Sequence, residues 1–247
     1  MQEILGRHVL KRDMEERTIL LGSNKVVFGS EGTAFRYRRY DGSALVSDSL
    51  IVTDSRETHL GIFPNPPTRV PREVAKNVYI KFKSPVIVDH KSVAVLYSKI
   101  PIEIGVYRQH KDEELLIDVF SLTPPRYALY GTPEAGVVCR YVEADAATEE
   151  SALEVKQYEE AKVRIRITND INNVIRVSRI IIPIDDVVLE HRNDDAWVPG
   201  SVEMQLDSAF GKDVVSVRLM DTRVKRIDKT SAKKTEDTLI FSMDGGY

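Results

Sequence analysis

The chain has 247 residues, of which 42% are hydrophobic and 30% charged, and its formal net charge at pH 7 is -3. These values are typical of a globular protein rather than a disordered, collagenous or membrane chain. The small net charge excludes a strong overall field that would gather nucleic acid or anionic lipid, so any such binding has to be local.

Cysteine usage and hydrophobic runs indicate the compartment. The sequence contains one cysteine, Cys139, and no Asn-x-Ser/Thr acceptor, so an internal disulfide is excluded and nothing indicates an oxidising environment. No apolar run approaches the roughly 20 residues that cross a bilayer, and the longest candidate, Ile180 to Ile184, is interrupted by Pro183. We therefore expect a soluble, cytoplasmic protein that is not membrane-embedded and has no evident targeting segment.

Apolar and polar residues alternate through most of the chain, which is the pattern of strands with one buried face. We predict a mostly β fold made of antiparallel β-sandwich-like units, two of them packed in tandem. The predicted strands cover residues 19–21, 26–28, 34–40, 45–53, 78–82, 86–88, 93–97, 102–106, 115–122 and 137–142, then one or two strands between 153 and 167, and 174–184, 187–190, 202–206, 214–219 and 238–243.

Two stretches interrupt this pattern. Four prolines between residues 64 and 71 cannot donate to a sheet ladder, which indicates a stiff connector. The acidic, small-residue stretch 143–150 predicts a domain linker or a brief helix. We place the boundary there, with an N-terminal β domain over residues 1–147 and a C-terminal β-sandwich-like domain over residues 148–247. A helix over residues 148–162 is an alternative, against which the alternation argues.

No distinctive catalytic or cofactor signature is present. The sequence lacks Gly-x-Ser-x-Gly, and its histidines have no recognisable partner spacing. Cys139 lies in an alternating apolar segment, where a buried thiol behaves as a small hydrophobe. The acidic residues between Asp185 and Asp195 could hold a hard cation, but solvated turns explain them more simply. We expect no cofactor and assign no metal ligand.

Basic and aromatic residues alternate between Phe35 and Tyr40. Such a segment can stack on and neutralise single-stranded nucleic acid. A strand with Phe35 and Tyr37 pointing inward and Arg36 and Arg38 pointing outward has the same pattern, and we favour that interpretation. The sequence therefore carries no strong nucleic-acid signal.

The most unusual segment runs from Asp118 to Pro133 and concentrates aromatic residues, prolines and an arginine, as ligand-facing loops of β scaffolds often do. The candidate ligand-binding residues are Arg126, Tyr127, Tyr130 and Arg140, which could converge on a small anionic or aromatic ligand. Core aromatics beside a rigid turn are the alternative explanation.

Three segments in order, 101–106, 117–122 and 127–141, resemble the motifs of an uncharacterised archaeal family, domain-of-unknown-function family four-three-two. The similarity is best between about residues 85 and 141. It implies an archaeal source and a β-rich soluble protein, and it carries over no catalytic residue.

The sequence favours a non-enzymatic binding or regulatory module that presents loops to a protein partner or a small ligand. The alternative is a small-molecule or glycan hydrolase that uses a bound metal or carboxylates such as Glu103 and Asp118. That chemistry requires the carboxylates to lie within several ångströms of each other in a concave pocket.

Overall fold

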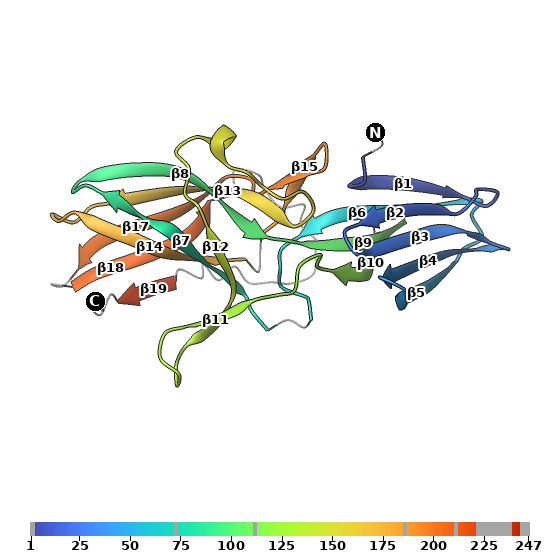
Figure 1. Cartoon of the computed structure of the whole chain (residues 1–247), viewed down its shortest axis with the longest axis horizontal. Coiled ribbons are helices and arrows are strands. Elements are labelled where there is room, and N and C mark those ends of the chain that lie inside the picture. The colour runs from blue at the N-terminus through green and yellow to red at the C-terminus, as the bar shows by residue number, and fades with distance from the viewer. Residues whose placement is uncertain are drawn as a thin grey trace.

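The computed structural model describes residues 3–71, 74–110, 113–184, 187–209, 212–220 and 239–242. These residues are mostly β, as predicted, and form two β units that lie end to end (Figure 1). The one helical element described is a 3-10 turn, η1 (Glu150–Ala152). No helix among the described residues is long and apolar enough to cross a membrane.

The first unit consists of two four-stranded antiparallel sheets whose inner faces share a core. Side chains along β4 alternate between this core and the surface: Phe35 and Tyr37 are fully buried, while Arg36 and Arg38 point outward. The predicted orientation of these four side chains is therefore confirmed. One sheet has the order β1 (Gly6–Lys11), β6 (Glu57–Asn65), β9 (Glu103–His110), β10 (Glu113–Phe120), and the other the order β2 (Arg17–Leu21), β3 (Asn24–Glu31), β4 (Ala34–Asp41), β5 (Ala44–Val52).

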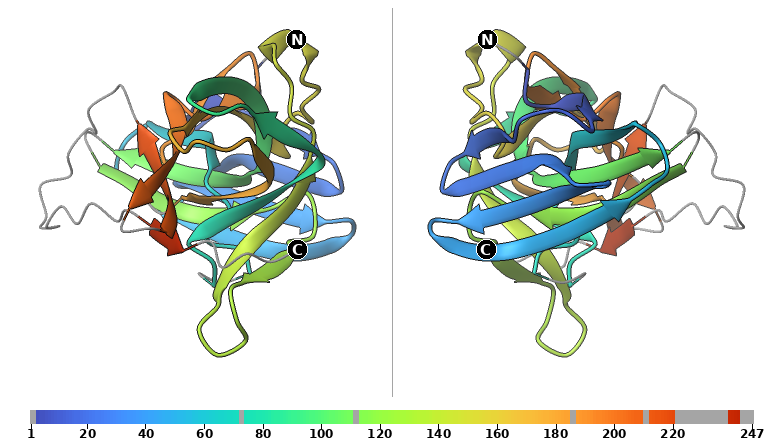
Figure 2. Two further views of the ribbon diagram at one scale, coloured as in Figure 1. Left: turned by 90° about the vertical axis from the view of Figure 1, so that its left-hand side faces the viewer. Right: turned by 90° about the vertical axis from the view of Figure 1, so that its right-hand side faces the viewer.

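The second unit also consists of two sheets, with the β11–β12 hairpin projecting from its body (Figure 2). One sheet has the order β11 (Tyr127–Tyr130), β12 (Val137–Ala144), β7 (Asn77–Val88), β14 (Ile175–Pro183). The other has the order β15 (Glu190–Arg192), β16 (Asp195–Trp197), β13 (Glu160–Asn169), β17 (Ser201–Ala209), β18 (Lys212–Met220), β19 (Leu239–Ser242), with β8 (Ser92–Pro101) also paired to β13.

Most strand pairs are antiparallel, as expected, but β7 with β12, and β13 with both β16 and β17, are parallel. Between β7 and β12 the chain runs out into the first unit and back, so no hairpin fixes their relative direction. The predicted strands at 78–82 and 86–88 form one strand, β7, whose pairing with β14 contains a register shift.

The chain passes between the two units three times: between β6 and β7, between β8 and β9, and between β10 and β11. The proline-rich stretch contributes to the first passage. Pro64 belongs to β6, where its missing N–H is tolerated because the neighbouring strand β1 pairs only as far as Ile62.

The sheets do not divide at the expected boundary between residues 147 and 148. Strands β7 and β8, which precede it, pair with β14 and β13, which follow it. The acidic stretch runs from the end of β12 through a loop to the start of η1, all within the second unit, and Ala147 exchanges both backbone hydrogen bonds with Tyr97 of β8. Its composition reflects solvent exposure rather than a link between two sheets.

Candidate functional site

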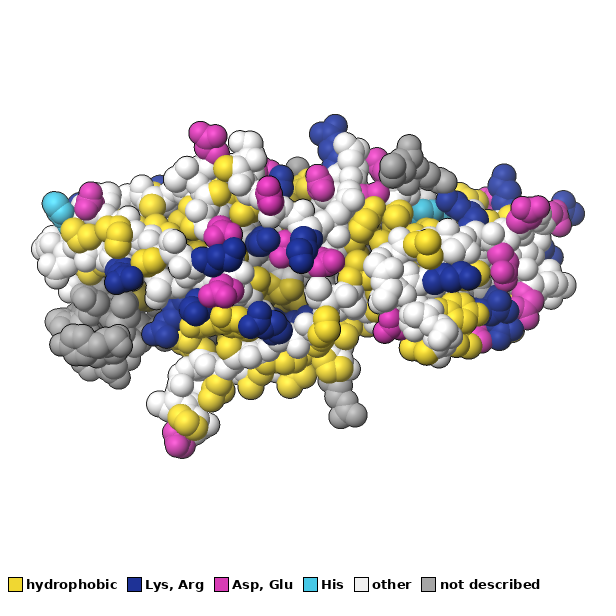
Figure 3. Space-filling view, in the orientation of Figure 1, with side chains coloured by type: hydrophobic (Ala, Val, Ile, Leu, Met, Phe, Trp, Pro, Cys, Tyr) yellow, Lys and Arg dark blue, Asp and Glu magenta, His cyan; other side chains and the backbone are white. Residues whose placement is uncertain are grey.

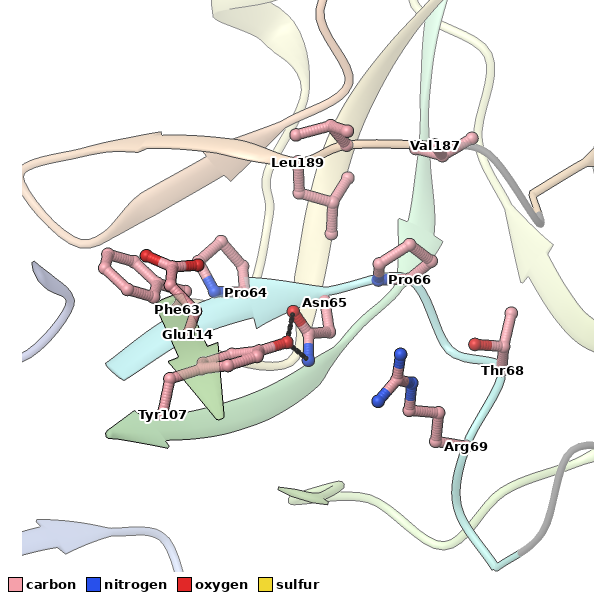
Figure 4. Close-up of a pocket in the computed structure, with 11 residues that line it drawn as sticks. Phe63, Pro64, Asn65, Pro66, Thr68, Arg69, Tyr107, Glu114, Val187 and Leu189 are labelled. Carbon is pink, nitrogen blue, oxygen red and sulfur yellow. Dashed lines mark hydrogen bonds between the residues drawn. The ribbon is translucent and has the colours of Figure 1, made fainter. Parts of the chain in front are cut away.

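A cavity of about 420 Å³ lies where the two units meet. Its walls come from the end of β6 and the connector after it, from β9 and β10, and from the segment before β15 (Figure 4). The lining residues are Phe63, Pro64, Asn65, Pro66, Thr68, Arg69, Tyr107, Glu114, Val187, Val188 and Leu189.

Asn65 and Tyr107 fix one wall of the cavity by two reciprocal hydrogen bonds. The Asn65 amide donates to the Tyr107 hydroxyl at 2.6 Å, and that hydroxyl donates to Asn65 Oδ1 at 2.9 Å. Gly105 makes room for the pair, because a Cβ there would collide with the Asn65 amide and the Tyr107 ring. Burial raises the pKa of Tyr107, so its hydroxyl stays protonated and able to donate.

Glu103 fixes the backbone of the connector, the proline-rich stretch of residues 64–71. Its side chain is fully buried, and its two oxygens accept the backbone N–H groups of Arg69 at 2.9 Å and Val70 at 3.0 Å. Burial raises the pKa of Glu103, while these two hydrogen bonds and the charges of Arg140 and Arg69 oppose that rise. The carboxylate is therefore a structural anchor that sets the backbone of the connector.

Tyr127 and Arg140 both donate hydrogen bonds to one carbonyl group of the connector, that of Val70. The Tyr127 hydroxyl donates to Val70 O at 3.1 Å, and Arg140 Nη1 donates to the same oxygen at 3.4 Å. The two residues are directly paired across β11 and β12, with the Arg140 guanidinium 5.3 Å from the centre of the Tyr127 ring. Arg140 is only 2% exposed.

The four predicted ligand-binding residues do not share one pocket. Tyr127 and Arg140 meet beside the connector, whereas Arg126 and Tyr130 lie on the opposite face of the same sheet, where Arg126 sits over the ring of Tyr141 at 4.9 Å. Successive side chains of a strand point to opposite faces, so residues one or three apart are separated by the sheet itself.

The cavity combines apolar and polar side chains with one cation that has no carboxylate partner among the described residues. Arg69 is exposed, and its side chain turns toward Asn65 and Pro66 (Figure 4). Val187 and Leu189 form the facing apolar wall. Glu114 lies at the other end of the cavity and accepts a 2.7 Å hydrogen bond from Gln109. Such a slot can hold an apolar body with an anionic group against Arg69.

The carboxylates considered for hydrolysis have structural partners. Asp118 accepts hydrogen bonds of 2.7 Å from both the Tyr37 hydroxyl and Arg39 Nε, inside the first unit. Of the acidic cluster, Asp194 binds the backbone N–H groups of Ile4 and Leu5, while Asp185 and Asp186 lie outside the described residues. Within the described part of the chain, no group of three or more His, Cys, Asp or Glu side chains is placed to hold a metal ion.

Cys139 and the basic strand β4 also have structural roles. Cys139 is fully buried, as expected, and burial raises the pKa of its thiol to about 11. Arg36 forms ion pairs with Glu31 at 2.8 Å and Asp48 at 2.6 Å. The arginines of β4 are thus engaged with carboxylates, and its aromatic residues Phe35 and Tyr37 are in the core.

Sequence reasoning missed the residues of the cavity itself. Arg69 stands in the proline-rich stretch, which was interpreted only as a connector, and Tyr107 and Leu189 belong to segments far apart in the sequence. Nothing local shows that these segments meet. The one local feature that could have indicated a binding site is Arg69 itself, because the rigid backbone of a proline-rich loop holds a cation at a fixed place.

Comparison with known proteins gives a family and no function. Searches of curated proteins and of solved structures each returned no match. A family model described as "Protein of unknown function (DUF432)" matches residues 4–239, which is nearly the whole chain. The chain therefore belongs to the DUF432 family.

Proposed function

We propose that the protein is a non-enzymatic binding module, and that the cavity between its two β units takes a small ligand with an anionic group and an apolar body. The observation that carries the proposal is the placement of Arg69, a cation without a carboxylate partner among the described residues, in the lining of a cavity that also has an apolar wall of Val187 and Leu189. The volume of about 420 Å³ falls within the usual range of small-molecule sites.

The backbone around Arg69 supports this proposal because it is fixed from both sides. Glu103 accepts the N–H groups of Arg69 and Val70, and Tyr127 and Arg140 donate to the carbonyl of Val70. A cation on a preorganised loop loses less conformational freedom when it binds an anion, which favours affinity.

A hydrolase is the weaker alternative. Glu103 uses both carboxylate oxygens to accept backbone N–H groups, and Asp118 is bound to Tyr37 and Arg39 in the core of the first unit. General acid-base catalysis requires a carboxyl group that reaches the substrate, and these two carboxylates are engaged elsewhere.

The test is a titration of the full chain with monocarboxylates, dicarboxylates and phosphate monoesters that carry aliphatic or aromatic bodies, followed by calorimetry and by thermal unfolding. We expect a ligand from this panel to bind and to raise the unfolding temperature. Replacement Arg69→Met should weaken that binding at least about tenfold, because it removes the charge-assisted hydrogen bonds while keeping an apolar stem.

Arg56→Met is the matched control, since Arg56 is exposed just before β6 of the first unit and does not line the cavity. It should leave the affinity unchanged. Failure of the whole panel to bind, equal effects of the two substitutions, or turnover of a panel compound would each overturn the proposal.

A further inference from the structure

Three tyrosines form a cluster on the outward face of the β11-β12-β7-β14 sheet, with Tyr79 in contact with the other two. Tyr79 of β7 stacks on Tyr141 of β12, with ring centroids 5.7 Å apart and an interplanar angle of 23°. Tyr79 also contacts Tyr130 of β11, with centroids 6.2 Å apart. The core of the unit lies on the other face of this sheet, so packing against the second sheet does not require these rings.

Two arginines lie over the outer members of this tyrosine cluster. The Arg126 guanidinium is 4.9 Å from the centre of the Tyr141 ring, and the Arg179 guanidinium is 5.8 Å from that of Tyr130. Neither arginine forms an ion pair with a carboxylate in the described ranges. Their charges are therefore held in place by aromatic rings, and no carboxylate among the described residues neutralises them.

Counted over the described residues, the same face has a local excess of positive charge on a chain whose net charge is -3. Its acidic residues Glu143 and Asp145 pair with Lys81 at 3.3 Å and Lys83 at 2.7 Å. Figure 3 shows basic side chains gathered over β7, β12 and β14. The outward basic residues of this face are Lys81, Lys83, Arg126, Arg176 and Arg179, so the three arginines exceed what its carboxylates neutralise.

We propose that this tyrosine and arginine face binds single-stranded nucleic acid. Unpaired bases stack on tyrosine rings and on guanidinium planes, and the phosphates between them pair with arginine. Tyrosine rings and arginine side chains, the two kinds of group that this recognition needs, lie in contact with each other on this face. A duplex keeps its bases stacked inside and cannot use the rings, and an anionic polysaccharide has no bases to stack.

The experiment measures fluorescence anisotropy of labelled oligo-dT and oligo-U of about 15 nucleotides, a length that covers one such site, titrated with the full chain. We expect both single strands to bind, with affinity that falls steeply between about 50 and 200 mM salt. A duplex of the same length and heparin should bind at least about tenfold more weakly.

Two substitutions locate the site. Tyr79→Ala removes the central ring and should weaken single-strand binding about tenfold. Arg179→Gln, at an exposed side chain, should weaken binding and lower the slope of log affinity against log salt by about one. Far-UV circular dichroism and thermal unfolding establish that each variant is folded.

Matched controls come from the other unit and from the cavity. Tyr40 is an outward tyrosine of the first unit, and the Lys25 ammonium lies 5.8 Å from its ring centre. Tyr40→Ala should leave the affinity for single strands unchanged. Arg69→Met should have no effect, which separates this face from the proposed ligand cavity. The proposal is overturned by no binding of either oligonucleotide, by equal or tighter binding of duplex or heparin, or by wild-type affinity in both Tyr79→Ala and Arg179→Gln.

Discussion

The N–H of Val70 donates a 3.0 Å hydrogen bond to the buried carboxylate of Glu103, 33 residues further along the chain. This bond joins two of the passages between the units, because Val70 follows β6 and Glu103 begins β9 directly after β8. Tyr127, which begins β11 after the third passage, donates to the carbonyl of the same Val70. The backbone of one residue, Val70, thus links all three crossings through its N–H and its carbonyl oxygen.

The first prediction concerns the pH dependence of this anchor. Burial raises the pKa of Glu103 above its ordinary value of 4.5. A carboxyl group with a raised folded-state pKa binds its proton more tightly in the folded protein, so its contribution to stability is greatest below the unfolded-state pKa and declines as the pH rises toward the folded-state pKa.

Relative to Glu103→Gln, the wild-type free energy of unfolding should therefore fall as the pH is raised from about 4.5. Urea denaturation across a pH series measures this difference. Glu57→Gln, at an exposed side chain of β6, is the control. A difference between wild type and Glu103→Gln that is constant across the series would contradict the assignment.

The second prediction compares a buried with an exposed ion pair. The side chains of Arg39 and Asp118 are 13% and 9% exposed, and Asp118 also accepts the hydroxyl of Tyr37. Asp118→Ala leaves a buried cation without its carboxylate and a buried hydroxyl without its acceptor, which should cost about 3–5 kcal/mol of unfolding free energy. Asp48→Ala, which breaks the exposed pair with Arg36, should cost much less. Equal losses for the two variants would show that the buried network is not a stabilising element.

The third prediction concerns the fragment 1–147. Strands β7 and β8 would lose their partners β14 and β13, so most of the second unit's sheets could not form. We expect the fragment to show few dispersed amide resonances from residues 77–101 in NMR spectra, and to gain them when fragment 148–247 is added. Native-like dispersion of those resonances in the isolated fragment would instead support an independent domain over residues 1–147.

Local pattern predicted most of the strands, because alternation reports which face of a strand is buried, but it missed some, among them β1, β6 and β16. It placed Phe35 and Tyr37 in the core, and their burial follows directly from the residue types. The candidate site was predicted less well. Tyr127 and Tyr130 are three residues apart, and the same alternation that built the fold puts them on opposite faces of β11.

The position of the cavity depends on pairings between distant segments. Tyr107 and Leu189 meet the proline-rich connector only because the chain crosses between the units three times. No local sequence pattern predicts these three crossings. Likewise, the sequence places Tyr79 in a predicted strand but does not show its neighbours. Tyr79 contacts Tyr141 because β7 pairs in parallel with β12.

The last prediction concerns the start of the chain. Asp194, in the turn between β15 and β16, accepts the N–H groups of Ile4 at 2.9 Å and Leu5 at 2.7 Å and the hydroxyl of Tyr158 at 2.8 Å. Burial and this carboxylate raise the pKa of Tyr158, so the hydroxyl remains a donor. Asp194 therefore fastens the segment before β1 to the second unit.

Asp194→Ala should cost about 1–3 kcal/mol, because it leaves these donors without their acceptor. Hydrogen exchange should show faster exchange of the Ile4 and Leu5 amides, while the amides of β13 stay protected. Asp194→Asn keeps one acceptor oxygen and tolerates the left-handed backbone at this position, where φ is 66°, so its effect should be smaller. Asp195→Ala, at the exposed neighbouring residue, should leave both amides protected. If both amides keep wild-type protection in Asp194→Ala, the segment is held by the packing of Leu5 and not by the carboxylate.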